Sequence, residues 1–170
     1  CARIANDNPD LDIQIVALPR VVNLSKREAD VAIAVSPPTS GRLSVQKLCD
    51  YHLHLAASRQ YLDAHAQINS VRDLAGHRIV GYIGDMIFDK ELDYLSDLGL
   101  ERVQLASSSV SVQFNWLRSE AGVGIVHDFA LPFAPNLKRI LTDDIVFKRS
   151  FYLVRHSDDR RLERMNRFAQ

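Results

Sequence analysis

The sequence has no excess of either charge and few cysteines. Its 170 residues include 21 Lys and Arg against 21 Asp and Glu, and only Cys1 and Cys49 carry thiols. A domain that holds DNA or RNA by itself usually shows a basic excess, because phosphate neutralisation supplies most of the affinity, so this class is disfavoured. Two cysteines form no disulfide framework, which predicts a cytoplasmic location. No apolar run reaches the ~18 residues of a membrane span, so no membrane partner is expected.

Glycine and proline are also scarce, at seven and six residues, whereas 46% of the residues are apolar. This composition is typical of a globular chain rather than a disordered one. Residues 1–8 have the pattern of the last turns of a helix that ends before Pro9, because the residue preceding a proline is pushed out of the α region. We therefore expect the chain to begin inside an element and to be part of a longer protein.

Short apolar runs alternate with helical patterns along the chain. We expect strands at 12–17, 30–35, 45–48, 53–57, 78–83, 103–106, 123–126, 137–141 and 145–154. Short helices are expected at 21–28, around 61–62 and after a Ser70–Asp73 capping signal. Three more helices are expected from apolar stripes: Phe88, Leu92 and Leu95 closed by Gly99, the stripe from Val110 to Ala121, and Leu162, Met165 and Phe168. Alternation of this kind predicts βαβ units and a mostly parallel sheet.

In open sheets of this type, ligands bind beyond the carboxyl ends of the strands. Four loops are expected there, at 36–41, 81–85, 106–110 and 125–129. The run Ser107-Ser108-Ser109 lies between a strand and a helix, so its hydroxyls and the free N–H groups of the first turn could hold a carboxylate or another small anion. Ordinary capping of the helix explains the same serines without a ligand.

Signals for catalysis or metal binding are weak. His52 and His54 project to one face of a strand, but no third ligand lies at a recognisable spacing. Gly81, Gly84, Gly122 and Gly124 form neither a dinucleotide-binding fingerprint nor a P-loop, and a role in close backbone approach fits them better. No nucleophile elbow or zinc-protease motif occurs. We therefore predict no catalytic residue, no metal ligand and no cofactor.

An ordered series of motifs resembles a known family. The series covers nearly the whole chain and consists of N-P-D-L-D-I-Q-I-V from Asn8, R-E-A-D-V-A-I-A-V from Arg27, G-R-L-S-V-Q-K-L from Gly41, L-A-A-S-R-Q-Y-L from Leu55, S-V-R-D-L-A-G-H-R-I-V from Ser70, S-S-S-V-x-V-Q from Ser107 and A-G-V-G-I-V from Ala121. Together these segments are similar to the effector-binding domain of LysR-type transcriptional regulators.

The resemblance implies a two-lobe α/β fold like that of type 2 periplasmic binding proteins, with mostly parallel sheets and flanking helices. Lobe I would comprise residues 1–53 and 155–170, and lobe II residues 54–154. Compared with the family, the chain would be truncated at its N-terminus, lacking the winged helix-turn-helix and the first strand of lobe I. A small-molecule effector would bind in the cleft between the lobes.

The resemblance also implies which residues contact the effector. The matching positions follow strands or begin a helix, and they are Val35, Ser36, Pro37, Tyr82, Ile83, Gly84, Ser107, Ser108, Ser109, Val110 and His127. His127 departs from the family, in which this position often holds an apolar residue. A titratable ring there could contact an acidic effector or cap the following helix.

The implied function is that of a cytoplasmic sensor domain, without enzyme activity, for a small anionic metabolite. The family implies homodimers or homotetramers, and DNA would be contacted by a domain outside this chain. A solute-binding protein of a transporter is the alternative, since it has the same fold. An enzyme on this scaffold would need a nucleophile, an acid–base pair or a metal in the cleft, and the sequence offers none.

Overall fold

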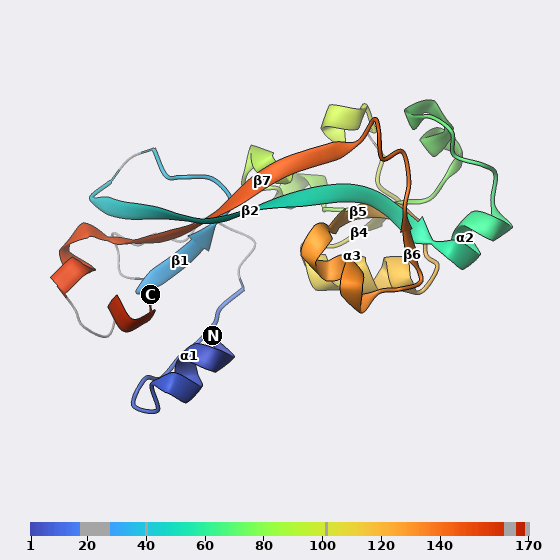
Figure 1. Ribbon diagram of the computed structural model, residues 1–170. Coiled ribbons are helices and arrows are strands. Elements are labelled where there is room, and N and C mark those ends of the chain that lie inside the picture. The colour runs from blue at the N-terminus through green and yellow to red at the C-terminus, as the bar shows by residue number, and fades with distance from the viewer. Residues whose placement is uncertain (18–27, 40, 101, 162–165, 169–170) are drawn as a thin grey trace. The chain divides into compact units, whose positions relative to one another are not determined.

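The computed structural model describes residues 1–17, 28–39, 41–100, 102–161 and 166–168. The chain forms two compact units. Unit 1 comprises Cys1–Leu48 and Phe151–Gln170, and unit 2 comprises Cys49–Ser150 (Figure 1). The chain passes between the units inside two long strands, β2 (Leu43–Ser58) and β7 (Val146–His156). The sequence-based lobe boundaries, at 53/54 and 154/155, stay a prediction.

Unit 1 contains one short helix and the outer parts of the two long strands. Helix α1 (Ala2–Asp7) ends at Asn8, directly before Pro9, as the sequence predicts. Strand β1 (Val31–Ala34) pairs antiparallel with β7, and a turn of 3₁₀-helix, η7 (Ser157–Arg161), follows β7. The predicted helix at 21–28 lies almost entirely outside the described residues, as do Leu162 and Met165 of the predicted C-terminal helix, where residues 166–168 are helical.

Unit 2 is built on a mixed sheet. Its strands β3 (Ile79–Gly81), β4 (Leu105–Ala106), β5 (Val123–His127) and β6 (Leu137–Arg139) join the second half of β2. Strand β3 pairs in parallel with β4 and β5, whereas β2 pairs antiparallel with β5 and β6. The predicted parallel arrangement is therefore correct around β3 and wrong around β2. A strand buried on both faces gives the same apolar run in either direction, so the pattern did not distinguish them.

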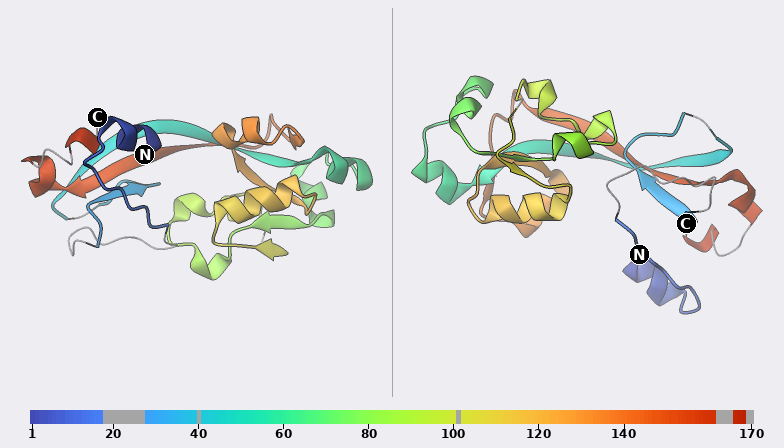
Figure 2. Two further views of the ribbon diagram at one scale, coloured as in Figure 1. Left: turned by 90° about the horizontal axis from the view of Figure 1, so that it is seen from below. Right: turned by 180° about the vertical axis from the view of Figure 1, so that it is seen from behind.

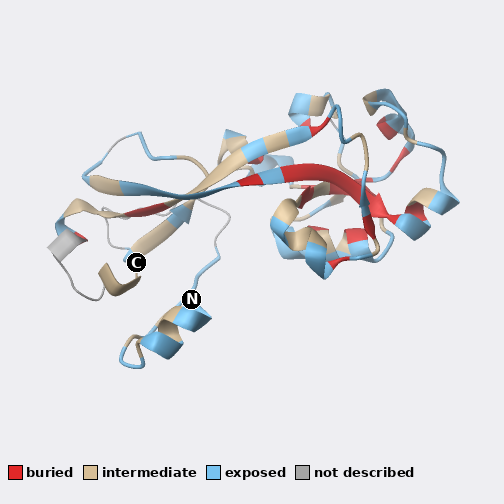
Figure 3. Ribbon diagram, in the orientation of Figure 1, coloured by how far each residue is buried: buried red, intermediate tan, exposed pale blue. Residues whose placement is uncertain are grey.

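Alternate residues of the unit 2 strands enter two cores, one on each face of the sheet. Leu55, Ala57 and Ile79 belong to the first, with Tyr61, Leu74, Leu95, Val123 and Ile145. Ala56 and Val80 belong to the second, with Leu117, Val126, Ala134 and Leu137. Helix α3 (Val110–Arg118) lies over β3 and β5 and adds Trp116 to the second core (Figure 2). Figure 3 shows the buried residues concentrated in the second half of β2 and the elements around it.

The connections of unit 2 are mostly single helical turns. Helix α2 (Arg59–Ala64) follows β2, and η2 (Val71–Gly76) begins with the predicted capping box of Ser70 and Asp73. The turns η3 (Gly84–Met86), η4 (Lys90–Leu92) and η5 (Ser96–Leu98) follow β3, and η6 (Asp128–Phe133) follows β5. The connections from β2 to β3 and from β3 to β4 are long, and each contains several of these elements.

Two predicted elements do not form in the described residues. The segment at 12–17 is extended without strand pairing, and Ile15 and Val16 are 74% and 70% exposed. The stripe of Phe88, Leu92 and Leu95 does not lie on one helix, because Phe88 precedes η4, Leu92 ends it and Leu95 directly precedes η5. Asp89 accepts a hydrogen bond from the Glu91 amide, and such local capping competes with helix continuation. Gly99 does close the segment, at φ +68°.

Candidate functional site

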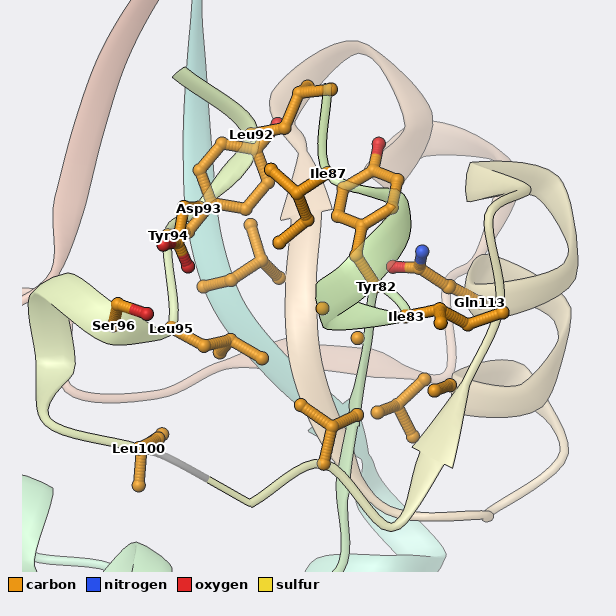
Figure 4. A pocket seen from close by; sticks show the side chains of 16 residues that line it. Tyr82, Ile83, Ile87, Leu92, Asp93, Tyr94, Leu95, Ser96, Leu100 and Gln113 are labelled. Atoms are coloured by element: carbon orange, nitrogen blue, oxygen red, sulfur yellow. The ribbon is translucent and has the colours of Figure 1, made fainter. Parts of the chain in front are cut away.

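A cavity of about 310 Å³ lies in unit 2 at the carboxyl ends of β3 and β4 (Figure 4). One wall is formed by the residues after β3, including the predicted Tyr82, Ile83 and Gly84, and by Ala106 at the end of β4. The opposite wall is formed by the segment 87–100, which contributes Leu92 and Leu95 of the apolar stripe but not Phe88. The position of the cavity is the one that the crevice rule for parallel strands predicts.

The two walls approach each other because β3 ends in a glycine. A Cβ atom at Gly81 would lie 2.5 Å from Cδ1 of Leu95 and 3.4 Å from Cγ1 of Val103. Both of these side chains line the cavity. Any larger residue at position 81 would therefore have to push Leu95 out of its place. Gly84, by contrast, has nothing within 4 Å of a built Cβ, so close approach does not explain it.

The lining is mostly apolar and contains no positive charge. The apolar side chains come from β3 and the residues that follow it, from β5 and from the segment 87–103, and they are Val80, Ile83, Ile87, Leu92, Leu95, Leu100, Val103 and Ile125. The polar residues of the lining are Tyr82, Asp93, Tyr94, Ser96 and Gln113. Neither Lys nor Arg occurs among the described residues that form this wall. The cavity is therefore suited to an uncharged group.

Two tyrosines form the polar part of the cavity nearest the apolar stripe. The rings of Tyr82 and Tyr94 have centroids 6.2 Å apart and are tilted by 51°. Figure 4 shows them on opposite sides of the pocket. Burial raises the pKa of both phenols above the usual value, so both stay neutral across the physiological range and keep a proton to donate.

The serine run lies beside the cavity but does not line it. Parallel pairing places Ala106 opposite Gly81, and the Ser107 amide donates to the Gly81 carbonyl at 3.0 Å. The structure thus brings the run next to the residues that follow β3. Gln113 of α3, which lines the cavity, donates from Nε2 to the Ser107 carbonyl at 2.7 Å and fixes the helix against this strand end.

Two of the three serines cap the backbone locally. The Ser109 hydroxyl accepts a hydrogen bond from the Val112 amide at the start of α3, and the Ser107 hydroxyl accepts one from the Ser109 amide at 3.1 Å. Ser108 takes no part in these bonds. The capping explanation therefore accounts for Ser107 and Ser109, although their hydroxyl protons stay available to an anion, whereas Ser108 has no capping role. Effector contact by the three serines and by the exposed Val110 stays a prediction.

His127 belongs to an aromatic cluster at the end of β5. Its ring stacks on Tyr51, with centroids 5.3 Å apart, and lies 5.0 Å from the ring of Phe129. Burial lowers its pKa, so the ring is neutral at pH 7. Although His127 precedes η6, its side chain makes no capping hydrogen bond to that turn. Capping by the side chain, one of the two roles considered from sequence, is therefore wrong.

The remaining predicted residues lie in unit 1. Val35, Ser36 and Pro37 directly follow β1, with Val35 and Ser36 half-buried and Pro37 exposed. They stay a prediction for effector contact. His52 and His54, in unit 2, have ring centroids 6.5 Å apart, and no group of three or more metal-ligating side chains gathers anywhere in the described part of the chain.

Sequence reasoning missed the wall opposite β3. Tyr94 was not singled out, and Leu92 and Leu95 were assigned to the packing face of a helix. A signal was present in the residue type of Asp89, Asp93 and Asp97, because Asp favours caps and turns over helix interiors. A broken segment of this kind near a strand end could have been taken as the wall of a pocket.

No helix in the described residues combines the length and the apolar character that crossing a bilayer would require. The fold and the cavity together define a two-unit α/β protein with a small-molecule-sized pocket at a parallel strand edge. Comparisons with known proteins give the family. The whole chain, residues 1–170, matches the family described as LysR substrate binding domain, and the chain belongs to this family.

Individual relatives agree with the family. The chain is 28% identical over 74 residues to the HTH-type transcriptional regulator CrgA of Neisseria meningitidis, from both serogroup C (strain 8013) and serogroup B (strain MC58). The match covers 44% of this chain and 25% of the relative, so the chain spans about a quarter of the length of these curated relatives.

Solved structures show the same fold. The regulatory domain of CrgA from Neisseria meningitidis superposes with a TM-score of 0.85 at 22% identity, covering 98% of this chain and 85% of that one. Full-length AphB, described as a virulence activator of Vibrio cholerae, gives a TM-score of 0.79 at 21% identity and covers 99% of this chain and 59% of its own. The predicted fold class, with its two-lobe periplasmic-binding-protein-like architecture, is confirmed.

Proposed function

We propose that this chain is the effector-sensing domain of a cytoplasmic LysR-type transcriptional regulator and that it binds a small anionic metabolite. The observation that carries the proposal is a pocket of ligand size in unit 2 of a chain that matches the LysR substrate binding domain over its full length. The relatives reported above are named as transcriptional regulators, which favours this function over a transporter's solute-binding protein. It also favours a regulator over an enzyme.

The anionic group of the effector would meet the first turn of α3. The N-terminus of a helix presents unpaired N–H groups and the positive end of the helix dipole. Ser108 adds a hydroxyl that local capping does not use. In the full regulator, preferential binding to one conformation would shift the population of states and, through homodimer or homotetramer contacts, act on a DNA-binding segment outside these residues.

The test is calorimetric titration of the 170-residue chain with a set of small carboxylates, namely acetate, succinate, benzoate and cyclohexanecarboxylate. We expect at least one to bind, and we expect Ser108→Ala to weaken it by about tenfold, the loss of one charge-assisted hydrogen bond. Ser119→Ala, an exposed serine at the opposite end of α3, is the matched control and should leave the affinity unchanged. Equal affinities in the two variants would remove Ser108 from the site.

A second measurement addresses assembly. Light scattering during size-exclusion chromatography, at two concentrations, should give a mass at or above twice the 19.2 kDa of the single chain. A chain that stays monomeric at high concentration would contradict the proposed self-association of this domain but not its ligand binding.

A further inference from the structure

We propose that the unit 2 cavity accepts an uncharged ring of the effector, so that the effector is a ring-bearing carboxylate rather than an inorganic anion or a short open-chain acid. This inference rests on the proposed function and assigns a ligand class to the same site. It divides the ligand into two parts, an apolar ring inside the cavity and an anionic group outside it at the start of α3.

The charges around the cavity exclude the anion from its interior. An isolated carboxylate loses its hydration on burial and needs a paired cation or several donors to offset the loss. None of the described lining residues is Lys or Arg, whereas Asp93 lines the cavity and would repel a negative group. The nearby Arg149 does not change this, because its Nε lies 2.7 Å from Oε2 of Glu91.

The apolar interior selects the part of the ligand that enters. A volume of about 310 Å³ lies at the lower end of the range of about 300–1,000 Å³ for small-molecule pockets, which is enough for one ring and its substituents. The walls are branched aliphatic side chains and the rings of Tyr82 and Tyr94. Aromatic rings prefer tilted or offset contact with another ring, and Tyr82 and Tyr94 already adopt a tilted geometry with each other.

The position of the serine run brings the two parts within reach of one small molecule. Ala106 lines the cavity and Ser107 is the next residue, while Gln113 lines the cavity and bonds to the Ser107 carbonyl. A carboxylate attached directly to a ring, or through one carbon, would therefore leave the cavity beside α3. Longer spacers would displace either the ring or the anion from its place.

The first test compares ligands on the unaltered chain by calorimetry. Benzoate and cyclohexanecarboxylate should bind at least about tenfold more tightly than acetate and succinate, because only they bury a ring. Benzamide retains the ring without the charge and should bind more weakly than benzoate, and inorganic phosphate should not compete. If acetate or succinate binds as tightly as benzoate, the ring assignment is overturned while the proposed anion sensor stands.

The second test fills the cavity. Ile87→Phe places extra carbon atoms at a lining position, and we expect it to reduce benzoate affinity by about tenfold or more while leaving acetate binding unchanged. Ile15→Phe makes the same substitution at a position 74% exposed in unit 1 and should change neither. Because Ile87→Phe could disturb folding, Ser96→Phe, which adds bulk at an exposed lining residue, serves as a second filling variant.

The outcomes separate the two proposals. Benzoate binding that is lost in both filling variants, with circular dichroism and melting temperature retained, supports the ring in the cavity. Benzoate binding that survives both variants overturns it, whatever the effect of Ser108→Ala. If no carboxylate in the set binds the unaltered chain, the anion-sensing function fails and the ring assignment fails with it.

Discussion

Strand β2 runs from unit 1 into unit 2, and its two halves differ sharply. In the unit 1 half, from Leu43 to Leu48, side chains are half-buried or exposed, and Val45 and Leu48 are among the exposed apolar residues. In the unit 2 half, from Leu53 to Ser58, every residue is buried. One continuous strand therefore has a half with few buried side chains and a half that is buried throughout.

The difference extends to the units as a whole. The described part of unit 1 buries Leu153, Val154 and Asp159, while Ile15, Val16 and Ile33 stay largely exposed. All of the other buried residues of the described chain belong to unit 2, in two cores around its sheet. Because buried apolar area supplies most of the folding free energy, unit 2 should be the more stable of the two.

Truncating one large apolar strand residue in each unit should give the largest difference between the units. Leu55 is fully buried in unit 2, so Leu55→Ala should lower the free energy of unfolding by about 2–5 kcal/mol through lost transfer energy and a residual cavity. Ile33 in unit 1 is 56% exposed, and Ile33→Ala should cost less than about 1 kcal/mol. Urea unfolding followed by circular dichroism measures both, and similar losses would show that the two units contribute equally.

Removing an ion pair from each unit should show the same difference in stability, with smaller effects. Arg149 of unit 2, 18% exposed, contacts Oε2 of Glu91 and lies over the ring of Phe147, so Arg149→Met should cost about 1–2 kcal/mol. In unit 1, Arg167 forms a bidentate pair with Asp10, both bonds measuring 3.0 Å, in which the carboxylate is 66% exposed. Arg167→Met should lower the melting temperature less than Arg149→Met, and the reverse order would contradict the burial argument.

Acidification should weaken unit 2 gradually. Burial lowers the pKa of His77 and His127 below the unfolded value of about 6.5, so in mildly acidic solution the unfolded chain binds more protons than the folded one. The stability contribution of the neutral rings is complete above pH ~6.5 and falls as the pH drops toward their lowered folded values. Melting temperatures from pH 7.5 to 5 should show a shallower decline in a His77→Gln, His127→Gln double variant. An unchanged decline would assign the acid sensitivity to other groups.

Local signals in the sequence predicted unit 2 well. The capping box of Ser70 and Asp73, the αL glycine Gly99 and the helix that begins after Ser109 are all confirmed. Each of these depends on neighbouring residues and on backbone chemistry that a short window contains. The strands β3 and β5 are also confirmed, because an apolar run between turn residues identifies a strand whichever partner it pairs with.

What depends on distant partners was not predictable. The segment at 12–17 has the alternation of a strand, but no strand in the described residues pairs with it. The antiparallel pairing of β2 likewise depends on which strands lie beside it, here β5 and β6. At the site, the loops after β3 and β4 were predicted from the crevice rule, whereas the opposite wall depends on how the segment 87–100 folds back over Gly81.

Trp116 gives unit 2 an optical signal of its own. It is the single tryptophan of the chain, it lies on α3, and it packs against the second core of unit 2. Its emission should shift to longer wavelength when this core opens to water, while unfolding confined to unit 1 should leave the spectrum unchanged. Excitation at wavelengths that tryptophan absorbs and tyrosine does not would therefore follow the unfolding of unit 2 without any label. Quenching or a spectral shift on adding a ligand would report binding next to α3, the helix that carries Gln113.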